Sequence, residues 1–174
     1  EEQLKAARDG AFIPALIEAG GSIFGLAGMI MGSVGAIREK TIRRMIAYSS
    51  VAQIGYIYMG FGLGIEAGIV ASVYHMFMHS ATKSLLFISA IGLTDASGYK
   101  RDFFEVTGAG YRNKIAGVGF TVGSLSMVGI PMFAGFVSKM LFAEAAIAGD
   151  SWRMFPAIIT LGISTILNAV YLVI

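Results

Sequence analysis

Three titratable side chains recur every fourth residue in one apolar stretch: His75, His79 and Lys83. A step of four residues advances about 40° around an α-helix, so the three lie on one narrow stripe, with Ser72 and Thr82 near it. Histidine titrates near neutral pH, and an amine in low-dielectric surroundings can release and regain its proton. Each group could exchange protons with water or a neighbour, which predicts a hydrated proton relay.

A second intramembrane lysine, Lys139, follows a predicted helix break by eight residues. Pro131 removes an amide donor and clashes with the preceding turn, while Gly129 and Gly135 allow irregular backbone. Interrupted helices are tolerated at membrane depth where they line a polar cavity, and transporters place ion sites there. We therefore predict a gate or relay at Lys139, with a simple proline kink as the alternative.

Several polar residues are predicted as accessories to these two sites. Ser138 stands beside Lys139, and Glu144 follows further along the same stretch. Glu18 lies one turn into the first apolar stretch, as an interfacial carboxylate or an exit-path residue. The alternative for Lys139 is that it snorkels to the interface, with Glu144 marking the membrane edge.

Metal and haem sites are weaker interpretations of the same histidines. Two histidines at this spacing can share a metal ion, but no third ligand is evident and Lys83 is a poor one. Axial haem histidines stand on opposite sides of the macrocycle, whereas His75 and His79 share one helix face. The chain has no cysteine and hence no thiolate cluster site. We expect it to bind no cofactor.

These residues belong to a strongly apolar chain. Hydrophobic residues make up 56% and charged residues 14%, and the mean hydropathy is +0.73. Crossing a bilayer takes roughly 20 apolar helical residues, and no stretch alternates as a barrel strand would. The sequence predicts an all-α integral membrane fold with five transmembrane helices, at about 14–36, 45–64, 67–93, 115–147 and 154–174.

The fourth stretch is too long for a simple span, because 33 residues make a helix of about 50 Å. This length also favours a break near Pro131. Residues 1–13 are predicted as an outer-side segment and 14–174 as the five-helix half-channel. The chain opens without an initiator methionine, so we expect a truncated boundary there.

The basic residues predict the orientation. The joints 37–44 and 94–114 fall on one side, and Lys5, Arg8 and Arg153 fall on the other. An excess of basic residues in short loops predicts the cytoplasmic or matrix side. The net charge of +2 gives no support for nucleic-acid binding. The joints carry eight basic residues: Arg38, Lys40, Arg43, Arg44, Lys100, Arg101, Arg112 and Lys114.

Three segments carry a family resemblance: 43–55 reads RRMIAYSSVAQIG, 75–87 reads HMFMHSATKSLLF and 129–139 reads GIPMFAGFVSK. In this order they resemble the proton-conducting antiporter-like membrane subunits. That family includes large membrane subunits of respiratory complex I, membrane-bound hydrogenases and Mrp-type cation/proton antiporters. A second proline is common in the family's helix break, and here Met132 stands in its place.

The resemblance implies two inverted repeats of five helices, each with one interrupted helix and one proton half-channel. The chain resembles the second repeat only. The family's lysine on the interrupted helix falls on Lys139, and its polar central helix supplies His75, His79 and Lys83. The first repeat, which carries a membrane glutamate and another buried lysine, would be a partner.

The predicted function is therefore proton translocation within a redox-driven complex, such as NADH-quinone oxidoreductase or membrane-bound hydrogenase, in an energy-coupling membrane. The chain itself would hold no redox site. Its partners would be other membrane subunits, the lipid bilayer and protons. Two alternatives stay open: an Mrp-type Na⁺ or K⁺/proton antiporter subunit, and a non-conducting subunit whose polar residues only join helices.

Overall fold

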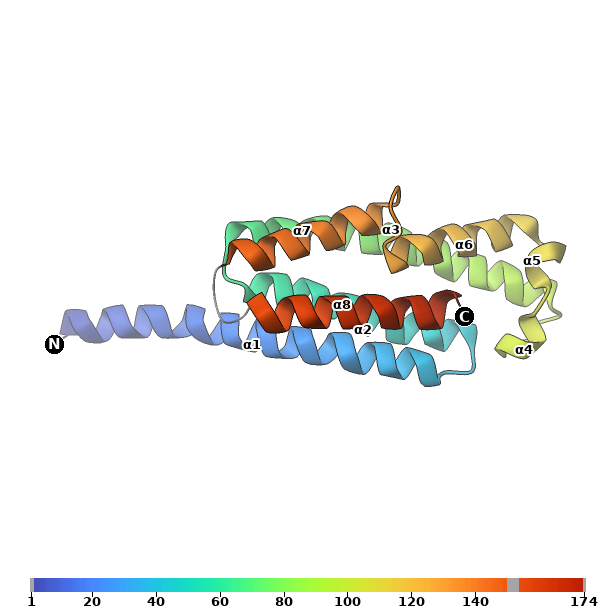
Figure 1. Cartoon of the computed structure of the whole chain (residues 1–174). Helices are drawn as coiled ribbons and strands as arrows, with labels where there is room; N and C mark the ends of the chain where they lie inside the picture. The colour runs from blue at the N-terminus through green and yellow to red at the C-terminus, as the bar shows by residue number, and fades with distance from the viewer. Residues whose placement is uncertain (1, 150–153, 174) are drawn as a thin grey trace.

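The computed structural model describes residues 2–149 and 154–173, with side chains from residue 19 onward. Five rods run roughly along one axis, and the interrupted pair α6 and α7 forms one of them (Figure 1). The described residues form eight helices: α1 (Glu2–Arg38), α2 (Ile42–Gly62), α3 (Glu66–Ala96), α4 (Phe103–Val106), α5 (Ala109–Arg112), α6 (Lys114–Val128), α7 (Ala134–Ala148) and α8 (Met154–Val173).

Helix length and composition agree with a membrane fold. Within the described residues, three helical stretches are long and apolar enough to cross a bilayer: Ala19–Arg38, Glu66–Ala96 and Met154–Val173. The 15-residue helices α6 and α7 are each about 22 Å long, shorter than a bilayer core of about 30 Å, so only the two in series can span it. Helix α1 extends beyond its predicted span to Glu2.

The predicted break in the fourth span is confirmed. Helix α6 ends in a Schellman motif, in which the Gly129 N–H donates to Ser126 O and the Ile130 N–H donates to Leu125 O, both at 3.1 Å. Gly129 has φ 88°, a conformation that favours glycine. Pro131 follows without an N–H, and the helix resumes only at α7. The interruption is thus a full break.

Met132, the residue after Pro131, has φ 83° and a fully exposed side chain. Proline is locked near φ −65° and cannot adopt this conformation. The observed conformation of the break is therefore incompatible with proline at position 132.

Helices α1 and α2 pack with their backbones in contact. A Cβ added to Gly25 would lie 2.5 Å from Met59 N, and one added to Gly55 would lie 2.6 Å from Met29 N. Small residues allow this close approach where lipid supplies no hydrophobic drive for helix association. The result is a tight hairpin against which α3 and α8 pack.

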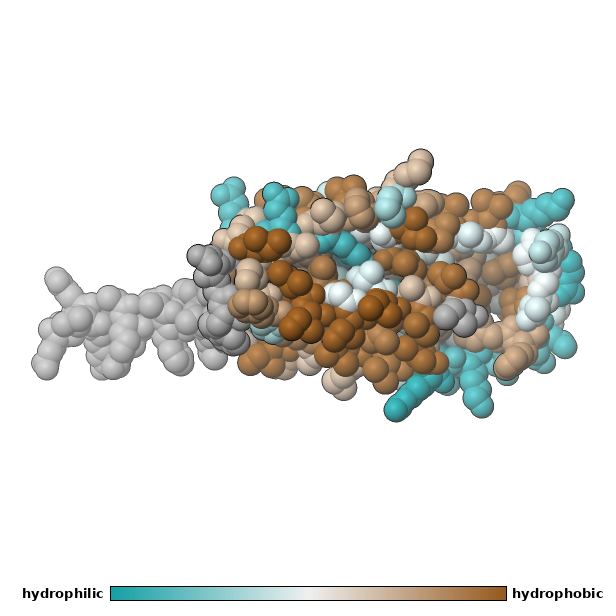
Figure 2. Space-filling view, viewed as in Figure 1, coloured by the Kyte–Doolittle hydropathy of each residue, from teal (hydrophilic) through white to brown (hydrophobic). Residues whose placement is uncertain are grey.

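The two basic joints meet at one end of the bundle. An antiparallel bridge pairs Thr41 with Asp102, and the Phe103 N–H donates to Lys40 O at 3.1 Å. Figure 2 shows apolar side chains over the middle of the bundle and many of the hydrophilic ones at this end. The predicted grouping of basic residues at one end is therefore present.

Candidate functional site

Helix α3 presents its titratable residues to the bundle interior. His75 is fully buried, His79 is partly buried and Lys83 is 7% exposed. The two imidazole rings stack with centroids 5.9 Å apart and planes 10° from parallel. Because α3 continues unbroken for 31 residues, its helical repeat alone aligns the three groups.

Lys83 is held by α2. Its Nζ donates to the backbone carbonyl of Ile46 at 2.6 Å and to the hydroxyl of Ser49. Among the side chains that the structure describes, no carboxylate oxygen lies within 4.0 Å of the ammonium nitrogen of Lys83 or Lys139. A buried cation without a counter-ion costs several kcal/mol, which structural pairing with a fixed acid would avoid. The described structure therefore lacks the acid that this structural interpretation of Lys83 requires.

Lys139 lies in the second turn of α7 and is 8% exposed. It does not snorkel outward: its Nζ reaches back across the break and donates to Val128 O at 2.5 Å. Val128 is the last residue of α6, where unpaired carbonyls and the helix dipole favour a cation. The break thus creates the acceptor that holds the lysine.

Two contacts join Lys139's helix to the histidine stripe. His75 Nδ1 and Ser138 Oγ lie 2.6 Å apart, and Ser138 is fully buried. The Tyr56 ring stacks on His75 with centroids 5.5 Å apart, and Lys139 Nζ lies 5.9 Å from the centroid of the same ring. The groups therefore follow in the order Lys83, His79, His75 and then Ser138 with Lys139.

The other predicted residues, Ser72, Glu144 and Glu18, have different outcomes. Ser72 is buried, one turn from His75, and donates to Gly68 O at 2.9 Å and Ile57 O at 3.0 Å, which ties α3 to α2. Glu144 is exposed, so the structure does not bring it into the stripe. Glu18 lies on α1 where side chains are outside the described residues.

The break residues have separate tasks. Gly129 leaves room for the Lys139 side chain, because a Cβ there would lie 2.8 Å from Lys139 Cδ. Gly135 packs directly on the Ser126 carbonyl, where a Cβ would overlap it. Pro131 is exposed in the loop between α6 and α7.

Sequence reasoning missed the polar faces of α2 and α8, which complete the interior. The Tyr171 hydroxyl donates to Asn168 Oδ1, and the hydroxyls of Ser33 and Ser164 lie 3.4 Å apart. The same four-residue spacing that marked α3 would have found both faces. The buried polar residues are Ser49, Gln53 and Tyr56 on α2 and Thr160, Ser164, Asn168 and Tyr171 on α8.

Several buried atoms in this interior have no hydrogen-bond partner among the described residues. Such atoms cost about 1–3 kcal/mol each, and most buried polar groups avoid that cost. A polar interior with free donors and acceptors can accommodate bridging water. The atoms are Gln53 Nε2 and Oε1, Tyr56 OH, His75 Nε2, His79 Nδ1 and Asn168 Nδ2.

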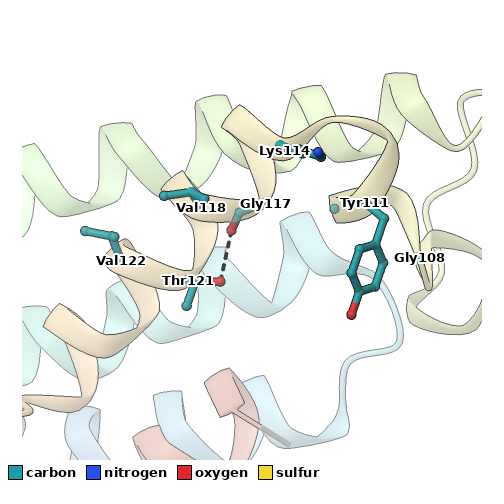
Figure 3. Close-up of a pocket in the computed structure, with 8 residues that line it drawn as sticks. Gly108, Tyr111, Lys114, Gly117, Val118, Thr121 and Val122 are labelled. Atoms are coloured by element: carbon teal, nitrogen blue, oxygen red, sulfur yellow. Dashed lines mark hydrogen bonds between the residues drawn. The ribbon is translucent and has the colours of Figure 1, made fainter.

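Among the side chains that the structure describes, from residue 19 onward, no group of three or more His, Cys, Asp or Glu residues could hold a metal ion. A groove of about 790 Å³ lies along α5 and α6, where Tyr111, Lys114 and Val118 line it (Figure 3). Thr121 Oγ1 donates to Gly117 O at 2.9 Å on its wall. None of the relay residues lines this groove.

Comparison with known proteins agrees with this architecture. Residues 17–165 match the family described as NADH:quinone oxidoreductase/Mrp antiporter, TM. NADH-quinone oxidoreductase subunit N of Desulforudis audaxviator is 33% identical over 145 residues, which cover 83% of this chain and 28% of that protein.

Two solved structures share the fold. A chain of the Mrp complex from Dietzia sp. DQ12-45-1b is 28% identical, with a TM-score of 0.82, over 91% of this chain and 29% of that one. A chain of the membrane-bound sulfane sulfur reductase, an archaeal respiratory membrane complex, is 27% identical, with a TM-score of 0.77, over 92% and 31%. This chain thus spans less than a third of each relative. It belongs to the NADH:quinone oxidoreductase/Mrp antiporter family of transmembrane subunits.

Proposed function

We propose that the chain is a proton half-channel of a multisubunit membrane complex. The observation that carries the proposal is the series of buried titratable groups from Lys83 to Lys139, without a described carboxylate to neutralise either lysine. Intramembrane ionisable residues mark ion pathways, because their burial is otherwise costly.

In the proposed relay, Lys83 releases a proton that passes through hydrogen-bonded water to His79 and then His75. A neutral imidazole accepts a proton on one nitrogen and releases one from the other, so each transfer leaves the ring neutral again. The His75–Ser138 contact leads to α7, where Lys139 takes up the proton. Lys139 then releases the proton toward the membrane side opposite the basic joints.

The complete transporter needs more than this chain. Its relatives are about three times as long, so we propose that a first repeat, on the same or another polypeptide, supplies the other half-channel. One relative is named as an NADH-quinone oxidoreductase subunit, which favours a redox-driven complex. The proposal gives this chain no redox cofactor of its own.

A cation/proton antiporter is the second candidate, favoured by the TM-score of 0.82 with a chain of an Mrp complex. Measurement of proton movement with and without Na⁺ or K⁺ distinguishes the antiporter from the redox-driven complex. Movement that requires Na⁺ or K⁺ supports the antiporter, and movement that requires electron transfer supports the redox-driven complex.

The decisive test reconstitutes the complete complex with Lys83→Ala or Lys139→Ala. Lys100→Ala is the control, because Lys100 is exposed at the basic end beside Glu105. We expect each buried-lysine variant to lose proton movement roughly a hundredfold at equal assembly, as for removal of a proton-transfer group. Normal pumping in both variants would overturn the proposal. A fall in assembly with unchanged transport per complex would identify a structural subunit.

The proposed orientation places the basic joints on the cytoplasmic or matrix side. The chain has no cysteine, so single cysteines can report sidedness. Thr107 directly follows α4 at the basic end, and Glu66 is the first residue of α3, which begins at the opposite end (Figure 1). Both positions are exposed and suit single cysteine substitutions. We expect an impermeant maleimide to label Thr107→Cys from the cytoplasmic or matrix side and Glu66→Cys from the opposite side. The reverse pattern would contradict the orientation.

A further inference from the structure

Helices α2 and α3 run antiparallel and present matching polar faces. At one end Lys83 donates to Ser49, and at the other His75 stacks on Tyr56. Gln53 lies one turn after Ser49, and His79 lies one turn before Lys83. Because one turn has the same length on both helices, this register places Gln53 at the level of His79.

The Gln53 side chain is unsatisfied at this level. It is 1% exposed, and neither Oε1 nor Nε2 has a partner among the described residues. His79 Nδ1 is also without a partner among the described residues. A buried amide with both halves unpaired is costly, whereas methionine would fill the same volume at no such cost. Packing alone therefore gives no reason for glutamine here.

We propose that Gln53 is a positioning residue of the proton relay, which rests on the proposed function. Its amide donates from Nε2 and accepts at Oε1. It therefore orders hydrogen-bonded water beside His79 and aligns that imidazole between Lys83 and His75. The amide itself does not titrate, so it orients the path without retaining the proton.

The test replaces Gln53 in the complete complex and measures two quantities, proton movement per assembled complex and thermal midpoint. Gln53→Met removes the amide at nearly constant volume. We expect roughly tenfold slower proton movement, the kinetic equivalent of one lost buried hydrogen bond, and a thermal midpoint that does not fall, because methionine fills nearly the same volume without a polar group to satisfy. Gln53→Asn keeps the amide and should retain most of the proton movement.

Thr94→Val is the matched control, since Thr94 is buried on α3 about 16 Å beyond Lys83 and bonds only locally to Ala90 O. It should leave proton movement unchanged. Unchanged movement in Gln53→Met would overturn the inference, as would a fall in both movement and thermal midpoint, which indicates a structural role. Equal losses in Gln53→Met and Gln53→Asn would also overturn it. Lys83→Ala and Lys139→Ala in the same series separate the two failures: if they lose transport while Gln53→Met does not, the proposed function stands without this inference.

Discussion

The two buried lysines are equally hidden but held in different ways. Lys83 sits near the middle of an intact helix, and its acceptors, Ile46 O and Ser49 Oγ, belong to the neighbouring helix. Lys139 sits beside a break, and its acceptor is Val128 O, at the end of the helix that the break terminates. One site is built by the packing of two intact helices, and the other by backbone that the break exposes.

This difference separates what each site depends on. The Lys83 site should tolerate small backbone changes but depend on the α2 face, whereas the Lys139 site should depend on the geometry of residues 129–133. Both sites should fail equally if the lysine cannot release its proton. Four sets of variants, in order of decreasing effect, test this contrast.

Arginine at either site gives the largest expected loss. Arginine stays protonated in proteins, so Lys83→Arg and Lys139→Arg should each slow proton movement roughly a hundredfold. Lys83→Arg should assemble normally, because two acceptors suit a guanidinium. Lys139→Arg should assemble less well, with one carbonyl acceptor and the close Gly129. Reconstituted transport and assembled yield measure both effects, and normal transport by either arginine variant would contradict the relay.

Alanine substitutions at two glycines distinguish the effect on Lys139 from the cost of placing a non-glycine residue at positive φ. Gly129 and Gly98 both have positive φ, 88° and 74°. A Cβ at Gly98 meets nothing within 4 Å, whereas one at Gly129 lies 3.4 Å from Lys139 Nζ. Both changes should cost about 1 kcal/mol of unfolding free energy. Only Gly129→Ala should slow proton movement, roughly tenfold, by displacing Lys139. Equal transport in the two variants would show that the break does not position the lysine.

Serine-to-alanine substitutions compare the side-chain hydrogen bonds of the two sites. Ser49→Ala leaves Lys83 its Ile46 acceptor, whereas Ser138→Ala removes the hydrogen bond between α7 and the His75 ring. We expect a roughly tenfold loss of proton movement for Ser138→Ala and roughly threefold for Ser49→Ala. Ser97→Ala, at the end of α3, is the control. A larger loss in Ser49→Ala would reverse the assigned order.

The smallest effect concerns Met132, the exposed residue at φ 83°. Met132→Gly should raise the unfolding free energy by about 1 kcal/mol and leave transport unchanged, because glycine adopts this φ without strain. Met132→Pro should instead destabilise the break. Unfolding in detergent measures both, and a stable Met132→Pro variant would refute the conformational argument.

The sequence predicted the all-α membrane fold and the break near Pro131, because apolar length and the Gly129–Pro131 pattern act locally. It did not predict where Lys139 points, since that depends on the position of Val128 O across the break. It also missed Gln53 and Tyr56, although their helical spacing from Ser49 marks a polar face on α2. The short helices α4 and α5 were absent from the prediction because the 94–114 joint has no periodic apolar pattern.

The acceptors of both lysines precede them along the chain: Ile46 and Ser49 come before Lys83, and Val128 before Lys139. A nascent polypeptide emerges from its N-terminal side, and domains generally form in that order. When the ribosome delivers each ammonium to the translocon, its hydrogen-bond acceptor has already been synthesised. Each lysine can therefore enter the membrane with its hydrogen-bond acceptor already present, and neither depends on a segment that is synthesised later.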